Sequence, residues 1–169
     1  LDNLLKWTKS QTGRLNVVLQ DLDLNDIIPG VVDIFEMIAA TKKITLNYHA
    51  AGQPLVVHAD NDMLKTVVRN FMSNAVKFSP ENSSIDITLS TEGSNAVVSV
   101  TDHGVGIAED RLAGLFHNGE TTYGTGGEEG SGLGLQLCKD FAVKNGGDVR
   151  VTSKLGEGST FSVVIPLKA

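Results

Sequence analysis

Two stretches of the chain combine residue types suited to binding phosphate, and the longer runs from Asp102 to Leu135. It opens with Asp-His-Gly-Val-Gly-Ile at 102–107 and closes with Gly-Ser-Gly-Leu-Gly-Leu at 130–135. Ten of the 18 glycines lie in it, and glycine is common where a backbone takes a positive φ or approaches a ligand. A glycine-rich turn that opens a helix presents free N–H groups to an anion. We interpret the stretch as a lid facing phosphate between two glycine hinges; the alternative is a long mobile loop with turn-forming glycines.

The second stretch is a predicted helix over residues 61–78 with two separate faces. Asn70, Asn74 and Lys77 follow one another at i, i+4 and i+7, and this polar stripe lies roughly a quarter turn from the centre of the apolar one. Magnesium takes oxygen ligands and keeps several waters, so two asparagines and a lysine at the margin of a core are suited to a hydrated magnesium ion and phosphate oxygens. The alternative is a partly solvated polar face.

Other helices and strands must position these two stretches, and hydrophobic periodicity with turn signals predicts them. A helix capped by Asp23 or Asn25 runs to about Lys42. The other predicted helices cover residues 1–12, 108–116 and 131–145. Strands are predicted over residues 15–22, 43–50, 54–59, 84–92, 95–101, 148–153 and 159–167. The strands at 84–92 and 95–101 alternate as an antiparallel hairpin, and the second delivers Asp102 to the edge of the sheet.

Three of the helices carry apolar faces that predict a core. The predicted core residues of the second helix are Leu24, Ile27, Ile28, Val31, Ile34, Phe35 and Ile38. Those of the helix over 61–78 are Leu64, Val67, Val68, Phe71 and Ala75. Those of the last helix are Leu133, Leu137, Cys138, Phe141 and Ala142, with Gly146 and Gly147 as its stop.

Composition narrows the class of protein. The 169 residues, 41% of them hydrophobic, suffice for one domain that buries roughly two-thirds of its unfolded surface. A net charge of −6 with scattered lysines and arginines argues against a nucleic-acid partner. The single cysteine excludes an internal disulfide and a cysteine-based zinc site. No membrane-spanning segment or signal peptide is found, and the start at Leu1 suggests a helix cut in the middle, so we expect a fragment of a longer protein.

In this order the motifs resemble the ATP-binding catalytic domain of sensor histidine kinases. That domain belongs to a superfamily with gyrase-type topoisomerases, heat-shock chaperones and mismatch-repair ATPases. Residues 70–78 resemble the N box, 102–107 the G1 box, 115–116 the F box and 130–135 the G2 box. The end of the chain, from Gly156-Glu157-Gly158 to Ile165-Pro166-Leu167, is similar to the closing strand of the family.

The resemblance implies an α/β (α+β) two-layer sandwich of the Bergerat type. A mixed, largely antiparallel sheet carries helices on one face, and ATP lies between the helices and the lid. Residues 15–169 would form this catalytic domain, and residues 1–14 would be the end of the dimerisation helix that carries the phosphoacceptor.

The resemblance also implies a role for each motif residue. Asp102 would accept a hydrogen bond from the adenine amino group, and Gly104 and Gly106 would let the backbone approach the purine. Asn74, supported by Asn70, would bind Mg²⁺, and Lys77 would neutralise phosphate charge. Amides at the G2 box would hold the phosphates, and Phe116 would anchor the lid or simply pack in the core. The nucleotide-binding set is Asp102, Gly104, Gly106, Ile107, Phe116, Gly130, Ser131, Gly132, Leu133, Gly134 and Leu135.

Phosphoryl transfer depends on alignment and charge neutralisation, and its nucleophile would be a histidine outside this chain. His49, His58, His103 and His117 lie in strand, strand-end, turn and lid contexts, so we expect them to be structural or exposed. In hydrolysing relatives a glutamate stands where this chain has Asn70, so the asparagine favours transfer over hydrolysis. No lysine or arginine lies between Arg111 and Lys139, whereas many relatives have a basic lid residue, so we expect weak ATP affinity.

The main hypothesis is therefore an Mg-ATP-dependent protein-histidine kinase domain that cannot autophosphorylate alone. One alternative is a degenerate nucleotide-binding regulatory module, and another is a gyrase-type hydrolase, which Asn70 disfavours. The partners implied are a phosphoacceptor histidine domain and a response regulator receiver domain. We expect a monomeric fragment of a homodimeric parent, located in the cytoplasm with or without an inner-membrane anchor.

Overall fold

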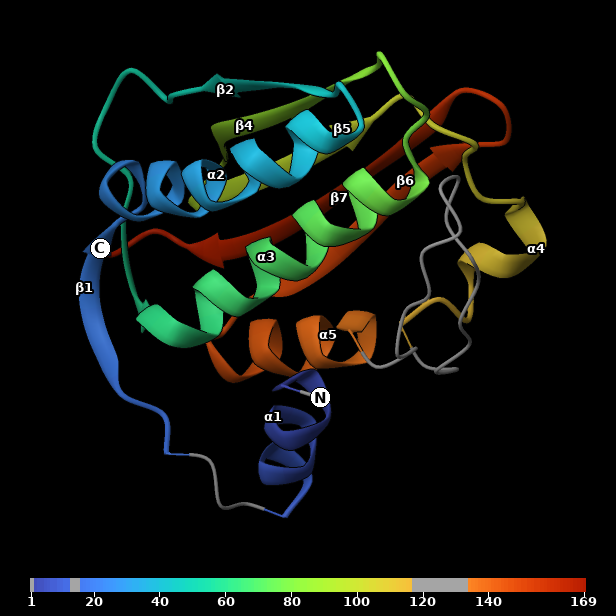
Figure 1. The fold of residues 1–169 in the computed structure, drawn as a ribbon. Coiled ribbons are helices and arrows are strands. Elements are labelled where there is room, and N and C mark those ends of the chain that lie inside the picture. The colour runs from blue at the N-terminus through green and yellow to red at the C-terminus, as the bar shows by residue number, and fades with distance from the viewer. Residues whose placement is uncertain (1, 13–15, 117–133) are drawn as a thin grey trace.

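The computed structural model describes residues 2–12, 16–116 and 134–169, which form helices packed on one face of a sheet. Figure 1 shows α2, α3 and α5 side by side across this face, with α1 beside α5. The helices are α1 Asp2–Gln11, α2 Leu24–Thr41, α3 Asn61–Phe78, α4 Glu109–Leu112 and α5 Gly134–Lys144. The strands are β1 Leu19–Asp23, β2 Thr45–His49, β3 Val56–Asp60, β4 Ser84–Glu92, β5 Asn95–Asp102, β6 Asp148–Lys154 and β7 Gly158–Pro166.

The large sheet has five strands in the order β2-β4-β5-β7-β6. Only β2 and β4 pair in parallel, and the other neighbours are antiparallel, so the predicted two-layer α/β fold with a mixed, largely antiparallel sheet is confirmed. The predicted hairpin is also confirmed, because Ile87 pairs with Val100 and Leu89 with Val98. Inward-facing residues of β4 are buried while their neighbours are partly exposed, as alternation requires.

The strands β2 and β3 follow each other in the chain but belong to different sheets. The connection between them includes Gly52 at φ 76°, yet β2 joins β4 and β3 pairs with β1 in a separate two-stranded sheet. A parallel pair needs a long crossover, and here β3 and α3 supply it. A bridge between Val57 and Leu167 links β3 to the segment after β7. β1 also begins at Leu19, later than the predicted residue 15.

Local sequence determines where the helices begin and end. Of the two predicted caps of α2, Asp23 is the one used: its carboxylate accepts from the Asn25 amide at 3.0 Å. α4 spans only Glu109–Leu112, and the chain continues in turns through Gly114, a poor helix former, so the prediction of a helix to 116 was wrong. α5 ends as predicted: Gly146 takes φ 80°, and the Gly147 amide donates to Ala142 O at 2.9 Å.

The core lies between the helices and the large sheet. Every predicted core residue of α3 is buried, as are the described ones of α5. On α2 the prediction was too broad, because Ile34 and Ile38 are 57% and 47% exposed. The buried face of α2 is centred on Ile28, Val31 and Phe35, and Ile34 and Ile38 lie to one side of it. None of the helices in the described ranges is long and apolar enough to cross a membrane.

A buried polar joint connects the start of α3 to the end of α5. Asp60 caps α3, since its Oδ1 accepts from the Met63 amide at 3.0 Å and its Oδ2 accepts from the Val18 amide at 2.8 Å. The Asp60 amide donates to Asn145 Oδ1 at 2.7 Å, and Asn145 Nδ2 donates to Phe141 O at 2.7 Å. A single asparagine side chain therefore fixes the relative position of two helices that border the candidate site.

Replacing this asparagine tests the joint. Asn145→Leu keeps the side-chain volume but leaves the buried Asp60 amide without an acceptor, so we expect the free energy of unfolding to fall by about 1–3 kcal/mol. Urea denaturation measures the change. The same substitution at exposed Asn16 is the control and should stay within about 0.5 kcal/mol. Equal effects of the two substitutions would show that the joint contributes little.

Candidate functional site

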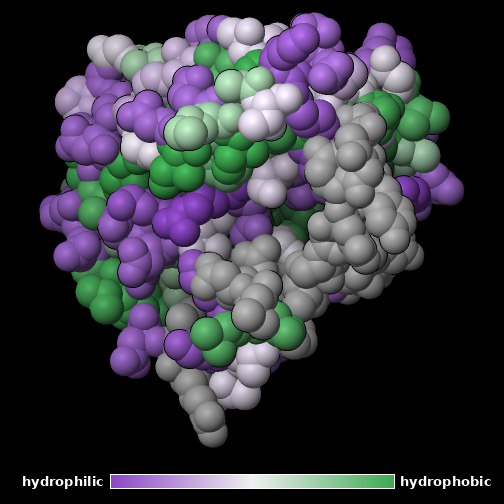
Figure 2. All heavy atoms as spheres, in the orientation of Figure 1, coloured by the Kyte–Doolittle hydropathy of each residue, from purple (hydrophilic) through white to green (hydrophobic). Residues whose placement is uncertain are grey.

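The polar stripe of α3 lies at the margin of the core, as predicted. Asn70, Asn74 and Lys77 are all partly exposed, and the surface is hollowed beside the C-terminal half of α3 (Figure 2). About a quarter turn round the helix, Phe71 is fully buried and its ring lies 5.5 Å from that of Phe161 on β7. This packing fixes the rotation of α3 about its axis and keeps the stripe at the margin of the core.

Asn70 is held by hydrogen bonds inside the protein. Its amide nitrogen donates to Thr66 O at 3.0 Å, and the side chain also hydrogen-bonds the sulfur of Cys138 on α5. The Cys138 thiol is fully buried and donates to Val67 O at 3.7 Å; burial raises its pKa, against the opposing effect of the Asn70 hydrogen bond. Sequence analysis placed Cys138 in the core but missed its contact with Asn70. The signal was a small buried residue soon after the second glycine motif.

Lys77 lies about two turns beyond Asn70 on α3, near the end of the helix. Its ammonium group lies 4.9 Å from the centre of the Phe78 ring. A second lysine, Lys42, donates to the carbonyl of Val76 at 2.9 Å and so satisfies one of the last carbonyls of the helix. Two lysine side chains therefore lie near the end of α3, and Lys42 satisfies one of the last carbonyls of the helix.

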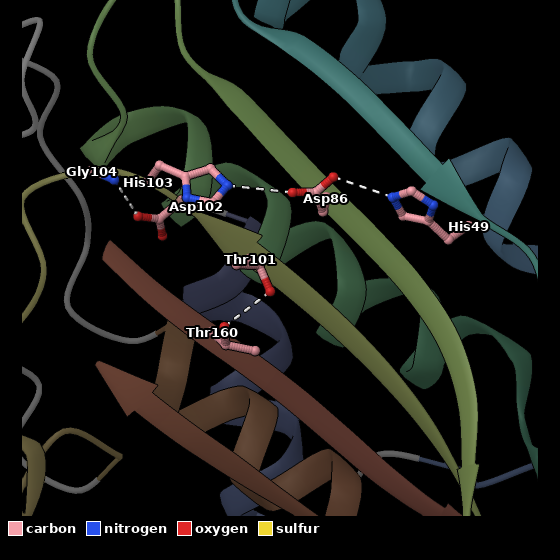
Figure 3. Close-up of polar contacts among 7 residues, drawn as sticks. All are labelled: His49, Asp86, Thr101, Asp102, His103, Gly104 and Thr160. Carbon is pink, nitrogen blue, oxygen red and sulfur yellow. Dashed lines mark hydrogen bonds and ion pairs between the residues drawn. The ribbon is translucent and has the colours of Figure 1, made fainter. Parts of the chain in front are cut away.

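Asp102 ends β5 at the edge of the sheet and is only 4% exposed. Its Oδ1 accepts from the Gly104 amide at 2.9 Å, as Figure 3 shows, and the Ser159 amide also donates to its carboxylate. Burial raises the pKa of Asp102, while these two hydrogen bonds and the nearby His103 act in the opposite direction. A buried carboxylate with these partners is a fixed acceptor for one further donor.

The glycines of the first motif are needed because the chain packs against itself. A Cβ on Gly104 would lie 2.1 Å from Phe78 O, and a Cβ on Gly106, at φ 73°, would lie 2.2 Å from Lys154 O. Sequence analysis explained both glycines by approach of the backbone to a purine. In the structure each of them approaches a backbone carbonyl of this chain, at the end of α3 and at the end of β6.

The turn between β6 and β7 supports the loop that follows Asp102, and sequence analysis missed this role. The Gly156 amide donates to Val105 O at 2.8 Å, and the Ile107 amide donates to Ser153 Oγ at 2.8 Å. Gly158, at φ 120°, has no room for a Cβ, which would lie 2.2 Å from Asp102 O. In the sequence, Gly156-Glu157-Gly158 indicated only a connection between two strands. The support that this turn gives to the loop after Asp102 was missed because the contact joins segments about 50 residues apart.

The remaining predicted residues flank this loop or lie outside the described ranges. Ile107, Phe116 and Leu135 are partly buried against the core, and the Phe116 ring lies edge-on to Phe161 with centroids 6.3 Å apart. Phe116 is therefore a core aromatic, and its role as a lid anchor stays a prediction. Gly134 and Leu135 begin α5. The other predicted residues lie outside the described part of the chain: His117, Gly130, Ser131, Gly132 and Leu133.

The three described histidines are about half exposed and each lies beside a carboxylate. His58 Nδ1 is 3.0 Å from Asp21, while His49 and His103 lie on either side of Asp86 (Figure 3). Within residues 2–12, 16–116 and 134–169, no three histidine, cysteine or acidic side chains are arranged to hold a metal ion.

Comparison with known proteins identifies the relatives of this chain. A family described as "Histidine kinase-, DNA gyrase B-, and HSP90-like ATPase" matches residues 59–169. The sensor histidine kinase ZraS of Escherichia coli (strain K12) is 34% identical over 152 residues, which are 90% of this chain and 32% of ZraS. The chain thus spans about a third of the length of this curated relative.

Two solved structures share the fold. A crystal structure of full-length ShkA in complex with AMPPNP has a TM-score of 0.84 and 27% identity, covering 99% of this chain and 35% of ShkA. The catalytic domain of histidine kinase ThkA, in a nucleotide-free form, has a TM-score of 0.78 and 28% identity. That match covers 89% of this chain and 96% of the ThkA domain.

Two glycines with nearly the same φ allow a matched test of the backbone contact. Gly106 and Gly52 have φ of 73° and 76°, but only Gly106 has a backbone neighbour where a Cβ would be. We expect Gly52→Ala to cost about 1–2 kcal/mol from φ alone. Gly106→Ala should cost more, because Lys154 must move, and urea denaturation compares the two. Equal losses of unfolding free energy in the two variants would mean that the loop at Gly106 can move away from Lys154 without disturbing β6.

Proposed function

Because the chain belongs to the family of histidine kinase-, DNA gyrase B- and HSP90-like ATPases, we propose that it is the ATP-binding catalytic domain of a sensor histidine kinase. In this proposal it transfers the γ-phosphoryl group of ATP to a histidine on another domain. The observation that carries the proposal is the buried Asp102 carboxylate, held at the sheet edge next to the end of α3. The relative ZraS is a sensor histidine kinase, and ShkA was solved in complex with the adenine nucleotide AMPPNP.

Asp102 supplies recognition of the adenine base. Its carboxylate is fixed by the Gly104 and Ser159 amides, so it does not have to reorganise when a base binds. The exocyclic amino group of adenine is the donor that such a buried acceptor requires. A base without that donor would leave the carboxylate poorly satisfied, which costs about 1–3 kcal/mol or more.

The polar stripe of α3 supplies the phosphate end of the site. The nitrogen of Asn70 donates to Thr66, and the side chain also hydrogen-bonds Cys138. An amide oxygen is the atom of asparagine suited to magnesium or a magnesium-bound water. Asn74 lies one turn further along the same stripe as the direct ligand, and Lys77 adds a point charge. When bound, Mg²⁺ neutralises phosphate charge during transfer. A donor set of two amide oxygens fits a metal that keeps most of its waters, and the Lys77 ammonium would face the phosphates and not the metal.

Gly134 and Leu135 open α5 and would turn the positive end of the helix dipole toward the phosphates. No lysine or arginine lies between Arg111 and Lys139, so Lys77, Mg²⁺ and backbone amides carry the neutralisation of phosphate charge. This small number of cations supports the expectation of weak ATP affinity.

Transfer to a histidine is favoured over hydrolysis by the amide at position 70. A neutral asparagine cannot take a proton from an attacking water, whereas an imidazole is already a nucleophile when deprotonated. The partners proposed are a phosphoacceptor histidine domain, from the same chain or a dimer mate, and a response regulator receiver domain. Residues 1–14 are proposed as the end of the dimerisation helix; in the structure Lys6 Nζ of α1 donates to Thr66 Oγ1 at 2.8 Å. The proposed location is the cytoplasm.

Calorimetric titration with ATP tests the binding site. We expect binding that requires Mg²⁺ and that weakens roughly 10- to 100-fold in Asp102→Asn, because an amide NH₂ group replaces one acceptor oxygen of the carboxylate. Asp33→Asn, on the exposed face of α2, is the matched control and should bind like the wild type. Tight binding by Asp102→Asn would remove Asp102 from base recognition.

Phosphoryl transfer tests the kinase activity. With γ-labelled ATP and a supplied dimerisation domain that carries the histidine, we expect acid-labile label on that domain and at least about tenfold less in Asn74→Ala. Ser73→Ala, the exposed neighbour on α3, is the control and should label normally. Steady phosphate release by this chain alone would instead indicate a hydrolase, and binding without transfer would indicate a regulatory module.

A further inference from the structure

A carboxylate outside the recognised motifs connects three neighbouring chain segments on the open face of the sheet. Asp86 lies on β4, and its Oδ1 is 3.2 Å from His49 Nε2 on β2. Its Oδ2 is 3.3 Å from His103 Nε2, in the turn directly after β5. Figure 3 shows the two imidazoles on opposite sides of this carboxylate, with Asp102 and Gly104 adjacent to His103.

His103 belongs to the turn that shapes the nucleotide site, between Asp102 and Gly104. On the buried side of the turn, Asp102 accepts from the Gly104 amide at 2.9 Å, and Gly158 packs against the backbone of Asp102 and His103. On the open side the His103 side chain reaches across to Asp86. The turn is therefore fixed from both faces of the sheet, and on the open face it is fixed by Asp86.

We propose that Asp86 is a positioning residue for adenine-nucleotide binding, which holds the turn after Asp102 through the hydrogen bond between its carboxylate and His103. The inference rests on the proposed function, because it concerns affinity at that same site. A hydrogen bond to an ionised carboxylate is stronger than one to a neutral acceptor. Only molecules with the turn formed present Asp102 to the base, so a looser turn lowers the apparent affinity.

The charges around His103 support this role of Asp86. Asp86 faces His103 from β4, with His49 from β2 beyond, and Asp102 is its neighbour on β5. In the β6–β7 turn, Lys154 and Glu157 lie 3.5 Å apart and pair with each other. Burial acts to raise the pKa of Asp86, but hydrogen bonds from His49, His103 and Asn47 outweigh it and keep that pKa below its usual value. Asp86 is therefore a charged acceptor at neutral pH.

The size of the effect follows from the exposure of the pair. Exposed pairs of this kind change equilibria between about 1.5- and 5-fold, and added salt reduces the effect. Asp86→Asn removes the charge of the acceptor, and His103→Ala removes the side chain that Asp86 holds.

The test is the affinity of the chain for Mg-ADP at low ionic strength. We expect the wild type to bind about 1.5- to 5-fold more tightly than Asp86→Asn or His103→Ala, and we expect the difference to shrink with added salt. His58→Ala removes a similar exposed histidine–carboxylate pair, 3.0 Å long and on the two-stranded sheet, and should match the wild type.

A second readout requires no nucleotide. Exchange of the Gly104 amide hydrogen should be faster in Asp86→Asn than in the wild type, because its bond to Asp102 opens more often. Equal affinities of all four proteins, or unchanged exchange at Gly104, would overturn the role of Asp86 while leaving nucleotide binding intact. Failure of the wild type to bind Mg-ADP at all would instead overturn the proposed function, and this inference with it.

Discussion

The whole site depends on the close contact between the Phe78 carbonyl, at the end of α3, and Gly104, in the turn after β5. A Cβ at position 104 would lie 2.1 Å from that oxygen, so only glycine lets the helix and the sheet edge meet there. The contact fixes the distance between the Asp102 carboxylate, the proposed acceptor for adenine, and the polar stripe of α3. Gly106 and Gly158 repeat this arrangement against Lys154 and Asp102, so three backbone contacts enclose one turn.

Features set by neighbouring residues could be predicted from the sequence, and features set by distant contacts could not. The partly exposed stripe of α3, the β4–β5 hairpin and the placement of Asp102 all follow from local periodicity. The separation of β2 and β3 into two sheets does not, because parallel pairing with β4 is decided across the α3 crossover. For the same reason the Cys138–Asn70 contact and the support from the β6–β7 turn were missed. Roles assigned to residues 117–133 stay predictions.

Two uncharged features of the sequence bear on the chemistry of this domain, one at position 70 and one in residues 112–138. The residue at position 70 is an amide, so it offers no base to an attacking water, and residues 112–138, which include the predicted lid, contain no lysine or arginine. Both features agree with the proposed enzyme, which would align a triphosphate and leave the nucleophile to its partner. The buried contacts that orient Asn70 are consistent with this division of roles, since they fix the geometry of the amide without adding reactivity.

The joint at Asp60 has a mechanical consequence. One carboxylate holds the backbone before β1 through Val18 and caps α3 through Met63, while the amide of the same residue is fixed by Asn145 at the end of α5. A displacement of the chain ahead of β1 would therefore act directly on the first turn of α3. Because α3 is one continuous helix from Asn61 to Phe78, such a displacement would move the helix as a unit. The polar stripe near its other end, with Asn74 and Lys77, would shift with it.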